Sequence, residues 1–208
     1  MLPESPFLYP IVDAATVGET AVPGTIERLT AAGLTLLQLR AKDVGDRALV
    51  ALARAAVAAA HRGGARLVLN DRVDVALLVG ADGVHVGQDD LPPAEARALL
   101  GPEAIVGVST HDLPQLALAA REPIDYVAIG PVFATQSKRD HEPVVGPALV
   151  RAGRAGLDVP LVAIGGVTRA NVGEVVAAGA DGIAVISDLL RAPDLEAAVR
   201  EFQAALRR

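Results

Sequence analysis

Gly80-Ala81-Asp82-Gly83-Val84 is informative about the fold, because a near copy, Gly179-Ala180-Asp181-Gly182-Ile183, begins 99 residues later. In both copies, a glycine suited to ending a helix precedes a short apolar run suited to a strand. If eight such units fill the 208 residues of the chain, each unit has about 26 residues and the copies lie close to four units apart. The repeat therefore places the two copies immediately before the fourth and the eighth strand.

The rest of the chain continues this pattern, with short runs rich in Val, Ile and Leu between longer Ala-rich segments. The runs do not alternate polar with apolar residues, which is typical of strands buried on both faces of a parallel sheet. The predicted strands are residues 8–12, 36–39, 67–69, 83–86, 105–108, 126–129, 161–164 and 182–186. The predicted helices are residues 21–32, 46–62, 72–79, 93–100, 112–121, 146–155, 169–178 and 194–207.

This strict alternation predicts an α/β fold with a parallel sheet, and eight units predict closure into a single-domain (β/α)8 TIM barrel over residues 1–208. A doubly wound sheet of five or six strands is the alternative, and it requires two or three of the predicted strands to be wrong. The chain shows no linker or low-complexity segment that would divide it. We therefore expect one domain.

The composition argues against several classes of function. Aromatic residues make up only 2% of the chain and its net charge is -6 with no basic run, so nucleic-acid binding is not expected. The absence of Cys excludes disulfides, thiol catalysis and zinc–thiolate sites. No apolar run reaches about 18 residues and no signal peptide is evident, so we expect a cytoplasmic protein without a membrane partner. A homo-oligomer is compatible with these features.

Polar side chains follow seven of the eight predicted strands, at the point where each strand ends. The segments are residues 38–43, 70–72, 85–90, 109–111, 130–138, 165–166 and 187. In a (β/α)8 barrel the carboxyl ends of the strands and the loops after them form the active site. Although any one of these residues could cap a helix, their convergence on one end of the barrel predicts a functional site there.

Two cations follow the second predicted strand. Arg40 and Lys42 are two residues apart on an extended segment, so their side chains point the same way. Together they could hold a pyrophosphate, for which Arg provides a planar fork and Lys a point charge. Ordinary ion pairs with Asp43 or Asp71 are the alternative.

Two carboxylates follow adjacent predicted strands, Asp71 after the third and Asp90 after the fourth. Mg2+ prefers a few carboxylates completed by phosphate oxygens and water, so the pair predicts a magnesium site beside the two cations. A turn or a helix cap is the alternative for each residue taken alone.

The longest connection follows the sixth predicted strand. Its segment from Thr135 to Lys138 could wrap a phosphate, and we expect residues 133–143 to form a mobile lid. Gly165-Gly166 lies where barrels commonly bind phosphate through backbone N–H groups. Of the two histidines near the strand ends, His85 is expected to be structural, whereas His111 is equally suited to capping and to catalysis.

Eight segments resemble those of one known family, in order along the chain from about residue 8 to residue 190. They are residues 8–13, 38–42, 70–72, 81–90, 107–109, 126–133, 135–138 and 163–167. Each motif is modest alone, but the ordered set resembles the thiamine-phosphate synthase family specifically. Ala41 stands where a charged residue is frequent in the family, and it is expected to face away from the cations on either side.

The resemblance implies a transferase that acts on small phosphorylated molecules. The reaction would join 4-amino-2-methyl-5-hydroxymethylpyrimidine diphosphate to a thiazole phosphate, releasing pyrophosphate and forming thiamine phosphate, with the C–O bond breaking first. The implied catalytic residues are Arg40, Lys42, Ser109 and Lys138, and Asp71 and Asp90 would hold Mg2+. Pyrimidine diphosphate would be bound by Gln38, Arg40, Lys42, Asn70, Ser109 and Lys138. Thiazole phosphate would be bound by Thr135, Gln136, Ser137, Gly166, Ile186 and Ser187.

Two other functions are compatible with the barrel. The related thiazole tautomerase transfers a proton and would need neither the cations nor the metal carboxylates. A non-catalytic binding protein of the thiamine pathway would be expected to lose those carboxylates or Lys138. All of these residues are present, which favours the synthase. The sequence leaves open the oligomeric state, the order of substrate binding and whether the thiazole is carboxylated.

Overall fold

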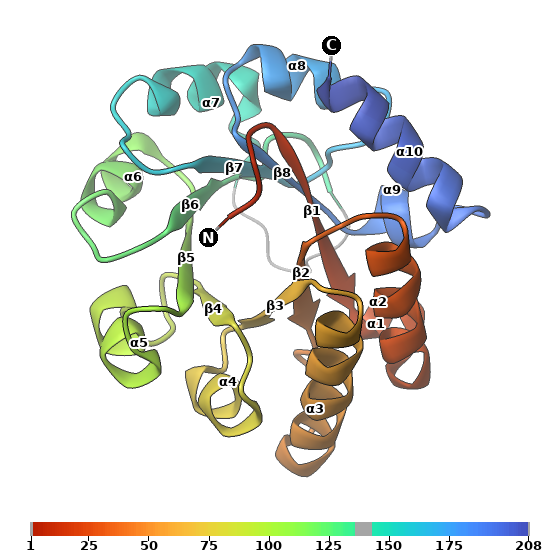
Figure 1. Cartoon of the computed structure of the whole chain (residues 1–208). Helices are drawn as coiled ribbons and strands as arrows, with labels where there is room; N and C mark the ends of the chain where they lie inside the picture. Colours follow the sequence, from red (N-terminus) through yellow and green to blue (C-terminus); the bar gives the residue numbers. More distant parts are fainter. Residues whose placement is uncertain (1, 136–142, 208) are drawn as a thin grey trace.

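The strands follow one another around a closed barrel in chain order, and the last pairs with the first (Figure 1). The computed structural model describes residues 2–135 and 143–207. The strands are β1 (Phe7–Asp13), β2 (Leu36–Arg40), β3 (Arg66–Asn70), β4 (Gly83–Val86), β5 (Ile105–Thr110), β6 (Tyr126–Ile129), β7 (Leu161–Ile164) and β8 (Gly182–Val185). Every pairing is parallel, so the predicted (β/α)8 barrel is confirmed and the doubly wound sheet is wrong.

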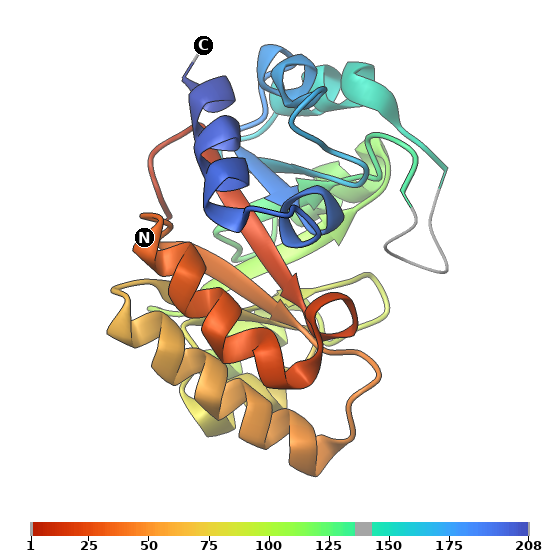
Figure 2. The same cartoon turned by 90° about the vertical axis from the view of Figure 1, so that its right-hand side faces the viewer.

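Helices surround the barrel on its outside (Figures 1 and 2). The longer ones are α2 (Val22–Ala31), α3 (Asp46–Arg62), α4 (Val73–Val79), α5 (Pro93–Leu100), α6 (Leu113–Ala119), α7 (Gly146–Arg154), α8 (Val172–Ala177) and α10 (Leu195–Leu206). Three shorter elements, α1 (Ala14–Val17), η1 (Glu19–Ala21) and α9 (Ser187–Leu190), were not predicted because three or four residues are too few to show a helical period. Within the described ranges, none of the helices combines the length and the apolar character that crossing a membrane requires.

One predicted helix begins later than expected. Helix α8 begins at Val172 because a turn occupies residues 168–171. Asn171 accepts a hydrogen bond from the backbone N–H of Thr168 at 2.7 Å and returns one from its own N–H to the Thr168 carbonyl at 3.2 Å. The predicted start of the last helix is confirmed, since Asp194 Oδ1 accepts from the N–H of Ala197 at 2.9 Å.

The repeated Gly-Ala-Asp-Gly sequence has a structural cause. Asp82 accepts a hydrogen bond from the backbone N–H of Leu67, which lies in β3, and Asp181 accepts one from Leu161 at the start of β7. These carboxylates satisfy strand N–H groups at the amino end of the barrel. Asp125 does the same for Val106 in β5, although its flanking sequence does not repeat the motif.

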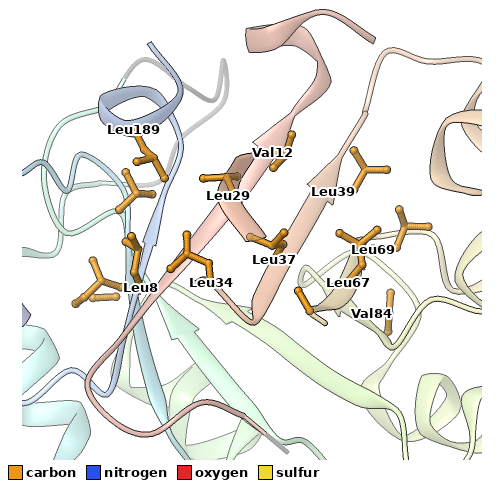
Figure 3. Packing of buried hydrophobic residues seen from close by; sticks show 14 of the residues in the cluster. Leu8, Val12, Leu29, Leu34, Leu37, Leu39, Leu67, Leu69, Val84 and Leu189 are labelled. Atoms are coloured by element: carbon orange, nitrogen blue, oxygen red, sulfur yellow. The ribbon is translucent and has the colours of Figure 1, made fainter. Parts of the chain in front are cut away.

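The core has two layers separated by the sheet. Successive side chains of a strand point to opposite faces, so Phe7, Tyr9 and Ile11 fill the barrel interior, while Leu8 and Val12 pack against the helices. Figure 3 shows part of the outer layer, in which Leu37 lies close to other apolar side chains. The barrel interior also contains buried polar side chains, among them Gln38 and His85, which line a cavity described below.

Candidate active site

Two adjoining cavities lie at the carboxyl ends of the strands. The larger, of about 690 Å³, is lined by residues that end or follow β2, β4, β5, β6, β7 and β8. The smaller, of about 90 Å³, reaches into the barrel interior, where Tyr9 and Tyr126 line it. Lys42, Ser109 and Ile186 line both cavities, so the two form one site. The predicted convergence of polar residues at this end of the barrel is therefore confirmed.

Arg40 is the most enclosed cation of the site. Its Nη1 donates to Asp13 Oδ1 at 2.7 Å, and only 13% and 6% of the two side chains are exposed. The second Asp13 oxygen accepts from the Thr16 hydroxyl at 2.8 Å. The Nε of Arg40 is buried and has no hydrogen-bond partner among the residues that the structure describes. Because a buried donor without a partner is costly, this N–H is suited to an anionic ligand in the cavity.

Asp71 and Asp90 lie close enough to interact, next to Lys42. Lys42 Nζ is 3.1 Å from Asp71 Oδ2, and Asp90 Oδ2 accepts from the N–H of Gly87 at 2.7 Å. Burial raises the pKa of Asp71 above its ordinary value, Lys42 opposes this shift, and Asp90 adds to it. Two neighbouring carboxylates favour a cation between them, so the pair fits a divalent metal ion. The ion pair between Lys42 and Asp71 that was weighed from the sequence is also present.

A chain of hydrogen bonds crosses the barrel interior below these charges. Gln38 Nε2 donates to the Tyr9 hydroxyl at 3.1 Å, and that hydroxyl lies 2.9 Å from the hydroxyl of Tyr126. His85 continues the chain, with Nδ1 2.9 Å from the Tyr126 hydroxyl and Nε2 2.8 Å from Ser109 Oγ. His85 is thus hydrogen-bonded on both ring nitrogens, which agrees with its predicted structural role.

The wall of the larger cavity is built where the loop after β6 packs on the Gly165-Gly166 turn. Phe133 N–H donates to the Gly165 carbonyl at 2.9 Å. Gly166 has a φ of 65°, and a Cβ there would lie 2.4 Å from the Ala134 carbonyl oxygen, so only glycine allows this approach. Thr135 and Gly166 consequently line the same cavity as Ile186 and Ser187, which follow β8.

The structure brings together the predicted site residues that it describes. The smaller cavity is lined by Gln38, Arg40, Lys42, Asn70, Asp71, Asp90, Ser109 and Ile186, and the larger by Lys42, Ser109, Thr135, Gly166, Ile186 and Ser187. Gln136, Ser137 and Lys138 lie outside the described residues, as does most of the expected lid. His111 lines both cavities, and its Nδ1 lies 2.6 Å from the Gly130 carbonyl oxygen.

Sequence reasoning missed three residues of the site. Asp13 is the last residue of β1, the one strand after which no polar residue was predicted to belong to the site. Its place at a strand end, like that of Arg40, could have identified it. Tyr9 and Tyr126 lie in the middle of β1 and at the start of β6, where an aromatic residue is most simply interpreted as core.

Comparison with known families matches residues 8–189 to thiamine monophosphate synthase. This chain belongs to that family. A thiamine-phosphate synthase from Koribacter versatilis is 48% identical over 192 residues, which cover 90% of each chain. One from Azorhizobium caulinodans is 43% identical over 196 residues, covering 94% of this chain and 92% of the relative. The solved thiamine phosphate pyrophosphorylase from Pyrococcus furiosus has a TM-score of 0.83 and 32% identity, covering 97% of this chain and 96% of that one.

Membership of the thiamine monophosphate synthase family confirms the resemblance found in the sequence. The matched region begins in β1 and ends in α9, so it contains seven strands whole, β1 without Phe7, and every predicted site residue that the structure describes. The individual roles of those residues stay predictions, and they rest on the geometry above.

Proposed function

We propose that this chain is a magnesium-dependent transferase that performs the reaction of thiamine-phosphate synthase. It joins 4-amino-2-methyl-5-hydroxymethylpyrimidine diphosphate to a thiazole phosphate and releases pyrophosphate. The observation that carries this proposal is the grouping of Arg40, Lys42, Asp71 and Asp90 around one cavity. Two cations and two carboxylates that line one cavity form a site for a diphosphate together with a metal ion. Because both substrates are phosphorylated metabolites, we propose that the enzyme works in the cytoplasm.

Departure of pyrophosphate is the step that this grouping serves. The C–O bond of the pyrimidine methylene breaks, its electron pair leaves with pyrophosphate, and the thiazole nitrogen lone pair forms the new C–N bond. Negative charge therefore grows on the leaving group, and the buried Nε of Arg40 and the ammonium of Lys42 are donors suited to it. Losing one such preorganised contact typically costs about 3–4 kcal/mol in the transition state. No strong general base is required.

Asp71 and Asp90 are the residues that would hold Mg2+. Among the described residues no group of three or more His, Cys, Asp and Glu side chains gathers as a metal site, so the two carboxylates would be the protein's share. That suits Mg2+, which commonly takes its remaining ligands from phosphate and water. Bound there, the ion would neutralise charge on the diphosphate oxygens.

The two ends of the site suit the two substrates. Gln38, Asn70 and Ser109 line the interior cavity and would hold the pyrimidine diphosphate. Thr135, Gly166, Ile186 and Ser187 line the outer cavity and would hold the thiazole phosphate. We assign Gln136, Ser137 and Lys138 to these substrates from the sequence motif alone.

The test is product formation by the purified chain supplied with both phosphorylated substrates and Mg2+. Mass spectrometry should find thiamine phosphate in the complete mixture and none when either substrate is omitted. Parallel reactions with the carboxylated and the uncarboxylated thiazole phosphate identify the second substrate. If neither thiazole gives thiamine phosphate under conditions where the chain is folded, the proposed function is wrong.

A further inference from the structure

The hydrogen-bond chain from Gln38 to Ser109 links β2 and β5, which are not neighbours in the barrel, through three buried side chains. Tyr9 and Tyr126 are each 1% exposed and His85 is 7% exposed. All five residues line the cavity assigned above to the pyrimidine diphosphate, with Gln38 on β2 and Ser109 on β5 at the two ends and Tyr9, Tyr126 and His85 connecting them. The chain of bonds therefore spans the interior cavity without a gap.

The packing of the rings holds this arrangement in place. The His85 ring stacks on Tyr126 with centroids 5.5 Å apart, and Tyr9 meets Tyr126 edge-on at 5.6 Å. Gly107 leaves the room for Tyr126, because a Cβ at that position would lie 2.1 Å from Tyr126 Cζ. Burial raises the pKa of both tyrosines well above their ordinary value, so each hydroxyl keeps its proton and can donate one hydrogen bond.

The donor and the acceptor in each of these hydrogen bonds can be assigned by starting from Gln38. Gln38 donates its amide N–H to Tyr9, and the other hydrogen-bond partner of the Tyr9 hydroxyl among the described residues is Tyr126, so the Tyr9 proton finds an acceptor when it is donated to Tyr126. The Tyr126 proton is then available for His85 Nδ1, which accepts it only as an unprotonated ring nitrogen. His85 consequently carries its proton on Nε2 and donates it to Ser109 Oγ. The Ser109 hydroxyl proton is left to point elsewhere, and Ser109 lines both cavities.

We propose that Tyr9, Tyr126 and His85 are positioning residues that make Ser109 a hydrogen-bond donor toward an anionic oxygen of the pyrimidine diphosphate. This inference rests on the proposed function. Oxygens of a diphosphate only accept hydrogen bonds. If Ser109 donated its proton to His85, it would have only lone pairs to present to those oxygens and could not bond them. At the other end, the same bonds keep the Gln38 oxygen and its second N–H available to the pyrimidine ring. The hydrogen bonds inside the barrel thus determine which groups of the substrate site donate and which accept.

The tautomer of His85 tests this direction without any substrate. Nitrogen NMR of the folded chain labelled in histidine, with His85 assigned by its loss in His85→Gln, should show a protonated Nε2 and an unprotonated Nδ1. Tyr126→Phe should shift this tautomer, because it removes the donor to Nδ1. Thr30→Val, which removes a buried hydroxyl in α2 outside this chain of bonds, is the control and should leave the His85 spectrum unchanged. Protonated Nδ1 in the parent chain, or an unchanged His85 spectrum in Tyr126→Phe, would overturn the inference.

Kinetics separate positioning from a merely structural role. Tyr126→Phe should lower kcat/KM for the pyrimidine diphosphate about tenfold, the equivalent of one ordinary hydrogen bond, and change KM for the thiazole phosphate little. Thr30→Val removes a buried hydroxyl that bonds the Glu27 carbonyl in α2, far from the cavities, and should leave both constants unchanged. Equal losses for both substrates in Tyr126→Phe would contradict positioning. A chain that makes no thiamine phosphate would instead refute the proposed function, while the His85 spectrum would still decide the direction of the bonds.

Discussion

Asp13 Oδ1 lies 2.7 Å from Arg40 Nη1, and this is the most enclosed ion pair among the described residues. β1 and β2 pair so that Asp13 and Arg40 are register partners. The carboxylate occupies one side of the guanidinium and leaves the buried Nε for another acceptor. Asp13 therefore determines how Arg40 meets the diphosphate, although it is not expected to contact the substrate itself.

Removing Asp13 should damage both stability and pyrimidine diphosphate binding. Asp13→Ala leaves a buried guanidinium without its counter-charge, which typically costs about 3–5 kcal/mol of unfolding free energy. Urea denaturation measures this loss, and steady-state kinetics should show a higher KM for the pyrimidine diphosphate. Glu27→Ala is the control, because its partner Arg62 is exposed and such a surface pair contributes at most about 1 kcal/mol. Equal effects of the two substitutions would contradict the role given to Asp13.

Asp71→Asn should reduce turnover far more than stability. Asparagine tolerates the φ of 64° at this position, so the backbone is retained. Burial and Asp90 already disfavour the charged form of Asp71, so loss of the charge should not destabilise the metal-free protein greatly. Activity measured against Mg2+ concentration should require much more Mg2+ than the parent, with a similar Tm. Unchanged turnover at limiting Mg2+ would remove Asp71 from the metal site.

Gly166→Ala should weaken thiazole phosphate binding by displacing the loop after β6. A Cβ would collide with the Ala134 carbonyl, and the left-handed backbone alone costs an alanine about 1–2 kcal/mol. KM for the thiazole phosphate is therefore expected to rise, while inhibition by pyrophosphate stays the same. Gly173→Ala in α8 meets open space and should instead stabilise the protein by about 0.5–1 kcal/mol. A normal KM for the thiazole phosphate in Gly166→Ala would show that this turn is not part of its site.

The barrel could be predicted from the sequence because its evidence is local and repeated. Each strand is a short apolar run between helices, and the recurring Asp82 and Asp181 mark two equivalent positions in the barrel. Boundaries were less predictable where turns intervene, as before Val172. Elements as short as α9 carry no periodicity from which they could be recognised.

The charged residues of the site could be predicted from the sequence, but the hydrogen bonds that link its buried residues could not. Arg40, Lys42, Asp71 and Asp90 stand at strand ends, where polar residues are conspicuous in the sequence. Tyr9 and Tyr126 are 117 residues apart, and nothing local indicates that their hydroxyls meet inside the barrel. Asp13 directly follows the first predicted strand, residues 8–12, but no role was assigned to it from the sequence.

Lys138 and His111 distinguish the synthase from the related tautomerase. Stabilising a departing pyrophosphate needs cations, so Lys138→Ala should lower kcat about a hundred- to a thousandfold. His111→Ala should keep a substantial part of the activity, because no proton transfer is required and the His111 ring bonds the Gly130 carbonyl. Rates of thiamine phosphate formation measure both variants. An active Lys138→Ala beside an inactive His111→Ala would reverse the assignment.

Pyrophosphate is expected to leave from a site formed by cations and a metal ion. The most direct measurement is the amount of pyrophosphate released and thiamine phosphate formed by the parent chain, with Mg2+ and with EDTA. We predict equal amounts of the two products with Mg2+, and loss of both with EDTA. Turnover that releases no pyrophosphate and is indifferent to EDTA would contradict the account.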